Sequence, residues 1–409
     1  MRRKTHIIIA GAALALVVAA AAAGASARHS TDPGITRKSI LLGGTFPLSG
    51  PASAYGVIPR AEGAYFDWFN AHSNIHGRKI KWKYYDDGYD PSQTVPQTRR
   101  LVEQDHVFAI FNSLGTANNL AVRPYLNQRH VPQTLLATGA VFWGQQYKKY
   151  PWTIGWNPDY IGEAKFYAQY IKSHIKGFKI GVLAQNDEYG DNYLKGLRAG
   201  LGTAKSKIVD VERYDVNDAT VASQMAKLKG SGANVFVDFA TPKASIQSLI
   251  LKDKLGWKGA VIINNVSGSP TFMRLVKTAA GSNAVDGAIS TGYPKDTTDP
   301  AQANDPGVKL FKSIMAKYYS SGNVNDSNNM YGMSAAWTVI YALQHSGKTP
   351  TRKSFMRALD HMNTAKDPFM LKGITVKTSS SDHYPIQQLN GLRWQGDYFH
   401  RFGKIYRWK

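Results

Sequence analysis

The sequence predicts an α/β protein built from two doubly wound parallel-sheet lobes. Three observations support this prediction: short apolar segments alternate with amphipathic ones along most of the chain, this rhythm runs twice in succession, and the 409 residues are enough for two such runs. Strands that alternate with helices of roughly 10–15 residues indicate βαβ units, and βαβ units build parallel sheets.

The first run starts at an apolar segment, 40–46, which is typical of a buried strand. A helix is expected over 57–72, because Ala61, Tyr65 and Trp68 recur at helical spacing. The remaining elements of this run are expected strands at 79–86, 107–111 and 131–137, a helix after Pro91 and a helix at 117–129.

A second run of the same kind begins after Trp156. Its expected strands are 179–184, 208–214, 234–239 and 260–264, and its expected helices are 160–174, 189–201, 221–229 and 244–255. The C-terminal part departs from this rhythm, with short expected strands at 373–376, 384–389 and 398–402 around Asn390-Gly391, a dipeptide typical of tight hairpin turns. We expect this antiparallel element to pack on one of the two lobes.

The N-terminus has the layout of a secretory signal peptide. A basic segment at 2–4 precedes an apolar segment at 7–23, and an A-x-A cleavage motif follows at 25–27. We therefore expect residues 1–27 to be cleaved, with a retained membrane anchor as the alternative. The chain has no cysteine, so no lipid-modified cysteine can follow the signal and no disulfide can support the core. A periplasmic location is expected, and secretion is the second option.

The chain carries a formal net charge of +22, which would ordinarily favour nucleic-acid binding. Lys and Arg are spread along the chain, however, and only the tail at 401–409 is locally dense. Together with the expected export, this distribution favours a solvated basic surface and no nucleic-acid partner.

Motifs of catalysis, cofactor binding and metal binding are absent from the sequence. It contains no G-x-x-x-x-G-K-[ST], no G-x-G-x-x-G and no H-E-x-x-H, and its 11 His residues lack ligand spacing. The nearest match to a nucleophile elbow is at Ser113, but Phe111 stands where the strained turn needs Gly. We therefore expect no enzyme activity, no cofactor and no metal.

Polar and small residues gather instead where the expected strands end. In doubly wound folds, ligands bind beyond the carboxyl ends of the strands. Taken singly, each such loop could be ordinary structure: 47–56 a turn, Gly115-Thr116 a helix cap, Tyr189 a packing residue. Together they predict a cleft for a small ligand held by backbone N–H groups, hydroxyls and aromatic walls. The loops are 47–56, 112–119, 137–144, 185–193, 240–245 and 264–269.

The order of these segments resembles that of type I periplasmic binding proteins, and most closely the leucine/isoleucine/valine-binding proteins of ABC importers. The matching segments are PLSGPASAYG (47–56), NSLGTANN (112–119), VPQTLLATG (131–139) and NDEYGDNYLKGL (186–197), and the resemblance extends from about Ile35 to Phe402. It implies two lobes that are joined by three crossings and close on a ligand between them. The expected boundaries are 1–27 for the signal peptide, 28–155 plus 285–368 for lobe I, and 156–284 plus 369–409 for lobe II.

By position, the resemblance implies a set of ligand-binding residues. Tyr55 would lie at the mouth of the cleft, Gly115 and Thr116 would bind a carboxylate, and Tyr189 would pack on the ligand. The complete implied set is Tyr55, Gly115, Thr116, Ala137, Thr138, Gly139, Trp156, Asn157, Tyr160, Tyr189, Thr241 and Asn265.

Two departures from the family pattern bear on the ligand. Asn265 stands where amino-acid binders usually place the acid that pairs with the ligand ammonium, so this counter-charge is missing unless Asp159 supplies it. Gly115 stands where Ser is common, with Thr116 beside it. An aromatic or aliphatic carboxylate, or an amide, would need no acid at Asn265. The expected ligands are therefore a small hydrophobic amino acid, as the resemblance implies, or a related carboxylate or amide, aromatic ones included.

The function implied by the resemblance is that of the solute-binding component of an ABC importer, a monomer that acts on a membrane permease. A ligand-sensing protein of the same fold that feeds no transporter is the alternative. A secreted enzyme is a third hypothesis, for which the sequence offers neither a nucleophile nor a metal set.

Overall fold

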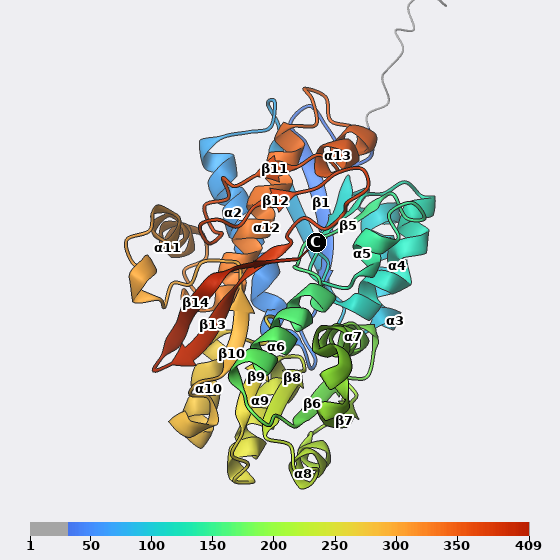
Figure 1. Cartoon of the computed structure of the whole chain (residues 1–409). Helices are drawn as coiled ribbons and strands as arrows, with labels where there is room; N and C mark the ends of the chain where they lie inside the picture. The colour runs from blue at the N-terminus through green and yellow to red at the C-terminus, as the bar shows by residue number, and fades with distance from the viewer. Residues whose placement is uncertain (1–31, 409) are drawn as a thin grey trace, which may run out of the picture. The chain divides into compact units, whose positions relative to one another are not determined.

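The first sheet places five parallel strands side by side in the order β2-β1-β3-β4-β5; Figure 1 labels β1 and β5 of this sheet. The computed structural model describes residues 32–408, so the predicted signal peptide at 1–27 lies outside the described residues. The order reverses between β1 and β3, and such a reversal is where doubly wound sheets bind ligands. The strand bounds are β1 (Ser39–Phe46), β2 (Lys79–Asp86), β3 (Ala109–Phe111), β4 (Gln133–Leu136) and β5 (Thr153–Gly155).

Helices cover both faces of the first sheet. On one face, α2 (Ile58–His72) packs against α11 (Pro306–Tyr318) and α12 (Ser327–Gln344). On the other face, α3 (Pro91–Arg99) packs against α4 (Thr116–Gln128). The sheet is therefore buried on both sides, as parallel sheets are.

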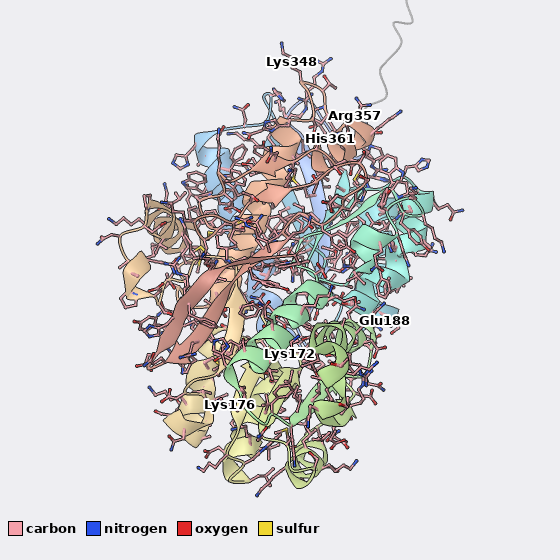
Figure 2. All side chains as sticks on the ribbon, in the orientation of Figure 1. Lys172, Lys176, Glu188, Lys348, Arg357 and His361 are labelled. Carbon is pink, nitrogen blue, oxygen red and sulfur yellow. The ribbon has the colours of Figure 1, made fainter. Side chains whose placement is uncertain are left out.

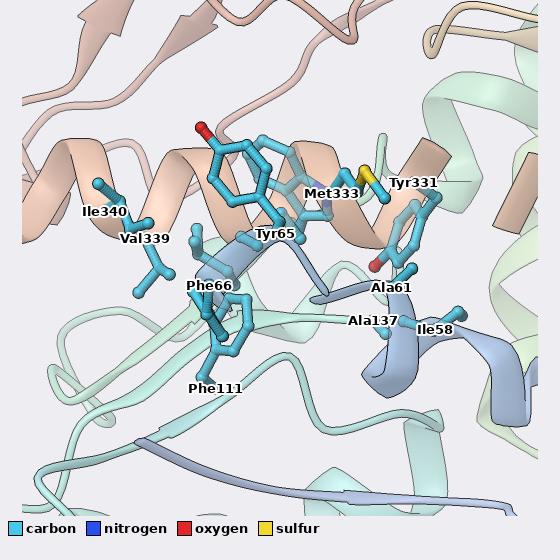
Figure 3. Close-up of a cluster of buried hydrophobic side chains, with 14 of the residues drawn as sticks. Ile58, Ala61, Tyr65, Phe66, Phe111, Ala137, Tyr331, Met333, Val339 and Ile340 are labelled. Atoms are coloured by element: carbon cyan, nitrogen blue, oxygen red, sulfur yellow. The ribbon is translucent and has the colours of Figure 1, made fainter. Parts of the chain in front are cut away.

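Strand β3 contributes side chains to the hydrophobic clusters on both faces of the first sheet. Successive side chains of a strand point in opposite directions. Ala109 and Phe111 join the cluster under α2 and α12, whereas Ile110 joins the cluster under α3 and α4. The ring of Phe111 lies 5.8 Å from that of Phe66 on α2, and Figure 3 shows the pair beside α12.

The second sheet has seven strands in the order β14-β13-β10-β9-β8-β6-β7. Strands β6 to β10 are parallel, and β13 and β14 add two antiparallel strands at the β10 edge (Figure 1). The bounds are β6 (Ile180–Gln185), β7 (Ile208–Tyr214), β8 (Val235–Phe239), β9 (Ala260–Ile263), β10 (Ile289–Gly292), β13 (Gln388–Gln395) and β14 (Tyr398–Arg407).

Helices also cover both faces of the second sheet. Helices α6 (Tyr160–His174) and α7 (Glu188–Leu201) pack together on one face. The other face carries α8 (Ala222–Gly230), α9 (Pro242–Lys254) and α10 (Pro270–Ala280). Each face has its own hydrophobic cluster, so the predicted α/β class with two doubly wound lobes is confirmed.

Short elements complete the described part of the chain. Within residues 32–408, no helix has the length and apolar character that a membrane span requires. The short elements are η1 (Ser53–Val57), η2 (Arg100–Gln104), α5 (Phe142–Gln145), η3 (Gly202–Lys207), η4 (Ser282–Ala284), η5 (Pro300–Gln302), α13 (Arg352–Leu359), β11 (Asn363–Thr364) and β12 (Val376–Lys377).

The lobe boundaries differ from those expected at residues 285 and 369. Strand β10 lies beyond the first of these positions but pairs with β9, with Ile289 opposite Ile262, so it extends the second sheet. Phe369 and Ile386 lie beyond the second position but pack in the hydrophobic cluster of the first lobe. The chain therefore crosses just after β10 and returns just before β13, because strand pairing and core packing decide these points.

The hairpin prediction at Asn390-Gly391 is wrong. Both residues lie inside β13, where they pair with Gly292 and Thr291 of β10. A Cβ at Gly391 would approach the rings of Phe166 and Phe402 to 2.8 Å, so glycine serves close packing there. The turn comes later, at positions 396–397, where the residue at 396 is a glycine with φ +70°.

Basic side chains are distributed over both lobes, as Figure 2 shows. Lys172 lies on α6 of the second lobe, whereas Arg357 lies on α13 of the first, and both are exposed. The described structure thus has no single basic arm.

Candidate ligand-binding site

A cavity of about 110 Å³ lies where the carboxyl ends of both sheets face each other. Such a volume holds several water molecules or a small organic group. Figure 3 shows three of its lining residues, Ile58, Ala137 and Tyr331, close together. Nine of the twelve residues predicted for the site line this cavity: Tyr55, Gly115, Thr116, Ala137, Asn157, Tyr160, Tyr189, Thr241 and Asn265.

The first loop of the cavity reaches across to the other lobe. The apolar strand β1 ends at Phe46, and the following small residues lead into η1, which carries Tyr55. The Tyr55 hydroxyl donates a hydrogen bond of 3.1 Å to the backbone oxygen of Val266, which follows β9 of the second sheet. The Tyr55 side chain therefore joins the two lobes directly.

The N-terminus of α4 forms a polar part of the wall. Gly115 is the N-cap of this helix and offers no side chain to the first-turn N–H groups. The partial positive charge of these N–H groups suits a carboxylate or another anion. Gly115 has φ +106°, and a Cβ would lie 2.3 Å from Oδ1 of Asn118, so only glycine fits here. Beside it, the hydroxyls of Thr116 and Thr138 are hydrogen-bonded at 2.7 Å.

Three predicted site residues support the wall from behind and do not line the cavity. Thr138 is buried and holds Thr116. Gly139 accepts a 2.9 Å hydrogen bond from the Tyr160 N–H, and a Cβ there would lie 2.7 Å from Cε1 of the Tyr160 ring. Trp156 is completely buried in the core of the first lobe.

Tyrosines from both lobes build the aromatic walls. The rings of Tyr160 and Tyr189 meet edge to face, with centroids 5.2 Å apart. The Tyr189 hydroxyl donates to the Ala240 oxygen at 3.2 Å, and the Tyr331 hydroxyl donates to Oδ1 of Asn157 at 3.0 Å. Burial raises the pKa of both phenols well above the usual value, so the hydroxyls stay protonated. Because these hydroxyls are occupied by the protein, the rings offer mainly apolar surface to a ligand.

The cavity also has lining residues that the sequence reasoning missed. Tyr331 lies inside α12 and nothing in the helical pattern distinguishes it from a core tyrosine. Tyr89 and Tyr293 follow strands β2 and β10, and this position is the one signal that could have found them. Leu114, Val266 and Gly268 lie in the predicted loops 112–119 and 264–269 but were not named as site residues. The lining residues outside every predicted loop are Ile58, Tyr89, Pro270, Thr291, Gly292, Tyr293, Pro294, Lys295, Asp296, Ser327, Asn328, Tyr331, Leu392 and Phe399.

Asp159 does not supply a counter-charge to the cavity, so that expectation is wrong. It is absent from the cavity wall, and its Oδ1 accepts the Gly162 N–H at 2.7 Å as the N-cap of α6. Its other carboxyl oxygen accepts a hydrogen bond from the indole of Trp408. Both oxygens thus serve the fold, because a residue just before a helix is the natural cap for that helix.

Asn265 lines the cavity, and a buried carboxyl group lies directly behind it. The Asn265 side chain donates to the Thr291 oxygen at 2.6 Å, while its backbone N–H donates to Oε1 of Glu163 at 2.7 Å. Burial raises the pKa of Glu163 to about 7, against the opposing effect of hydrogen bonds from Tyr167, Asn265 and Tyr193. Glu163 was not among the predicted site residues.

Two further charges border the cavity. Lys295 forms an ion pair with Asp305 at 2.5 Å, and Asp296 accepts hydrogen bonds of 2.8 Å from the backbone and hydroxyl of Thr298. No group of three or more side chains suited to a metal ion occurs in the described range 32–408. The cavity thus offers N–H groups suited to an anion, hydroxyls and aromatic walls, together with Lys295 and Asp296, which are both engaged with protein groups.

The fold recurs in solved structures of binding proteins. A branched-chain amino acid ABC transporter protein from Thermus thermophilus with bound valine matches with a TM-score of 0.79 at 19% identity, over 91% of this chain and 97% of that one. A fatty acid ABC transporter substrate-binding protein from Thermomonospora curvata matches with a TM-score of 0.77 at 21% identity, over 93% and 95%. At these identities the likeness shows the fold alone.

Relatives and a family model extend the comparison to the sequence. The Leu/Ile/Val-binding protein homolog 8 of Brucella abortus is 23% identical over 369 residues, which cover 87% of this chain and 88% of the relative. The family model for periplasmic binding proteins matches residues 39–398. The resemblance found in the sequence is confirmed, and the chain belongs to the periplasmic binding protein family.

Proposed function

We propose that the protein is the extracytoplasmic solute-binding component of an ABC importer. Its ligand is a small hydrophobic amino acid or a related carboxylate or amide, bound by closure of the two lobes. The observation that carries this proposal is a cavity that combines the N-terminus of α4 with aromatic walls from both lobes. An anion-binding end and an apolar remainder are what a hydrophobic carboxylate requires.

The comparisons support the same ligand class. One structural neighbour holds valine and another is named for fatty acids, and both ligands are hydrophobic carboxylates. Relatives are named as Leu/Ile/Val-binding proteins. The contact between Tyr55 and Val266 supports closure, because it joins the lobes next to the cavity.

Thermal unfolding with a panel of compounds tests the proposal. The panel contains leucine, valine, phenylalanine, leucinamide, 4-methyl-2-oxopentanoate, phenylacetate and octanoate. A ligand at 100 times its Kd stabilises the folded protein by about 2.7 kcal/mol, which corresponds to a rise in Tm of roughly 3 °C for a chain of this size. We expect at least one compound to give such a rise, and a smaller rise with the same compound in a Tyr189→Ala variant. No rise with any member of the panel would contradict the proposal.

A matched control separates site effects from general ones. Tyr170 lies on α6 outside the cavity lining, where its hydroxyl accepts a hydrogen bond from Arg393. A Tyr170→Ala variant removes the same side chain type, so we expect it to retain the full Tm rise that Tyr189→Ala reduces.

A further inference from the structure

The buried carboxyl group of Glu163 lies directly behind Asn265, close enough to the cavity for its charge to affect a bound ligand. Glu163 lies on α6, one turn after Tyr160, and Tyr160 lines the cavity. Only 2% of Glu163 is exposed. Its Oε1 accepts hydrogen bonds from the Tyr167 hydroxyl at 2.6 Å and from the Asn265 N–H at 2.7 Å, and its Oε2 accepts one from the Tyr193 hydroxyl at 2.9 Å. Three donors are therefore directed at a carboxylate that is one hydrogen bond away from the cavity wall.

No cation in the described structure neutralises this carboxylate. None of the ion pairs formed by residues 32–408 includes Glu163. The titratable groups that face it are neutral tyrosines: Tyr160 and Tyr167 from α6, Tyr193 from α7 and Tyr293 after β10. The polar groups from the other packed elements are Asn265 after β9 and Thr291 of β10. A buried carboxylate with hydrogen bonds and no cation is incompletely compensated, because buried charges are normally paired.

The wall in front of Glu163 offers an acceptor to the cavity. The carboxamide nitrogen of Asn265 is engaged with the Thr291 oxygen at 2.6 Å. No described residue donates a hydrogen bond to its carboxamide oxygen. This oxygen is not one of the fully buried atoms without a partner, so it keeps some exposed surface. A ligand N–H group can therefore bind to this oxygen with the Glu163 carboxylate directly behind it.

We propose that Glu163 is the counter-charge for a ligand ammonium group bound at Asn265, and that the ligand is a hydrophobic α-amino acid. This inference rests on the proposed function and narrows its ligand class. It also accounts for the neutral residue at position 265, because the negative charge is retained one layer behind the wall. Glu163 is a positioning residue in this account, since Asn265 separates it from the ligand.

The proposed pair has a defined dependence on pH. Burial raises the pKa of Glu163 to about 7 in the free protein, so below pH 7 the carboxyl group is protonated. An ammonium group nearby favours the ionised form, so amino-acid binding releases a proton at low pH. Affinity for the amino acid therefore rises as the pH increases through 7 and levels off once the carboxylate is ionised in the free protein. At an effective dielectric constant of about 20, two opposite unit charges separated by one intervening residue attract by a few kcal/mol, which changes affinity on the order of 10- to 100-fold.

Titration calorimetry with matched ligand pairs tests this inference. Leucine and phenylalanine are each compared with their 2-oxo acids, which keep the carboxylate and side chain but lack the ammonium group. Each compound is titrated at pH 5.5 and 8.0 in two buffers of different ionisation enthalpy. We expect the amino acid to bind at least tenfold more tightly at pH 8.0 and to release a proton at pH 5.5, whereas its oxo acid shows neither effect.

Two variants locate the effect. Glu163→Gln should weaken amino-acid binding at pH 8.0 by at least tenfold, remove its pH dependence and leave oxo-acid binding within a few-fold of the original. Glu103→Gln is the matched control, because Glu103 is an exposed acid in η2 and lies outside the cavity lining. We expect it to behave as the unmodified protein. The pH profile and the proton count need no variant, so they test the inference even if Glu163→Gln fails to fold.

The outcomes distinguish this inference from the proposed function. If amino acid and oxo acid bind equally well at both pH values, with no proton released, the inference is overturned and the proposed function stands. If the oxo acids bind and the amino acids do not, the inference is again overturned. If no compound in either pair binds at any pH, the proposed function fails as well for these hydrophobic acids.

Discussion

Removal of the Tyr55 hydroxyl tests whether contact between the lobes contributes to binding. Tyr55 is 5% exposed, and its hydroxyl donates to the Val266 oxygen of the other lobe at 3.1 Å next to the cavity. A Tyr55→Phe variant keeps the ring and loses this hydrogen bond together with the interaction of the hydroxyl with Ser267. Burial raises the pKa of Tyr55 well above its usual value, so the donor is present throughout the pH range of a binding experiment.

The expected change in Kd follows from the energy of one neutral hydrogen bond, that of Tyr55 to Val266, which forms when the lobes are in contact. Such a bond contributes about 0.5–1.5 kcal/mol net. If closure accompanies binding, the variant loses this amount from the bound state, and Kd should rise about 2- to 10-fold. Because the bond joins protein to protein, every ligand should be affected by the same factor.

Titration calorimetry with one amino acid and its 2-oxo acid measures this factor. Tyr170→Phe is the control, since it also removes one hydrogen-bonded hydroxyl but lies outside the cavity lining. An unchanged Kd for Tyr55→Phe would show that the Tyr55 contact has no part in binding. A loss confined to one ligand would show that the hydroxyl contacts the ligand instead of the other lobe.

Three further substitutions address the wall and the buried acids. Tyr189→Ala should weaken ligand binding by about 1–3 kcal/mol in calorimetry with an unchanged circular dichroism spectrum, because one aromatic wall is lost; unchanged affinity would remove Tyr189 from the site. Gly115→Ala should abolish carboxylate binding and lower Tm, because the residue has φ +106° and its Cβ would meet Asn118; full binding would refute the role of the α4 N-terminus. Burial raises the pKa of Asp367 to about 7, so its stabilising contribution is present at low pH and is lost as the pH rises through 7. Denaturant unfolding at pH 5 and 8 should therefore show that Asp367→Asn becomes relatively more stable at pH 8 by about 2 kcal/mol, and a pH-independent difference would contradict the raised pKa.

Much of the site followed from where the strands end. Parallel strands bring their carboxyl ends to one edge, so loops that are far apart in sequence meet there. This geometry explains why Tyr55, Thr116, Tyr189, Thr241 and Asn265 line one cavity. Their small, hydroxyl and aromatic character was visible in the sequence, and the strand pattern indicated that their loops lie at the same edge of each sheet.

Other parts of the site depend on packing that no local pattern encodes. Tyr331 belongs to a helix in which 13 of 18 residues are buried, and only the approach of α12 to the cavity distinguishes it from its neighbours. Glu163 lies in an ordinary amphipathic helix, and its importance depends on contacts with Tyr193 and Asn265, which are distant in sequence. Asp159 seemed suitable by position, but the start of α6 determined its partners.

The hairpin shows the same limit for the fold. Asn390-Gly391 is a strong local turn signal. Pairing with β10 overrides that signal, because both residues fit between neighbouring strands and the glycine admits the rings of Phe166 and Phe402. Tertiary packing therefore decided where the chain turns, and the turn between β13 and β14 lies at 396–397.

A crystal structure with the compound that gives the largest rise in Tm tests the central claim most directly. The account predicts that the ligand carboxylate lies at the N-terminus of α4, beside Gly115 and Thr116, and that its apolar part lies against Tyr189. For an amino acid, the ammonium group should lie at Asn265. A ligand outside this cavity, or one whose carboxylate points away from α4, would contradict the account.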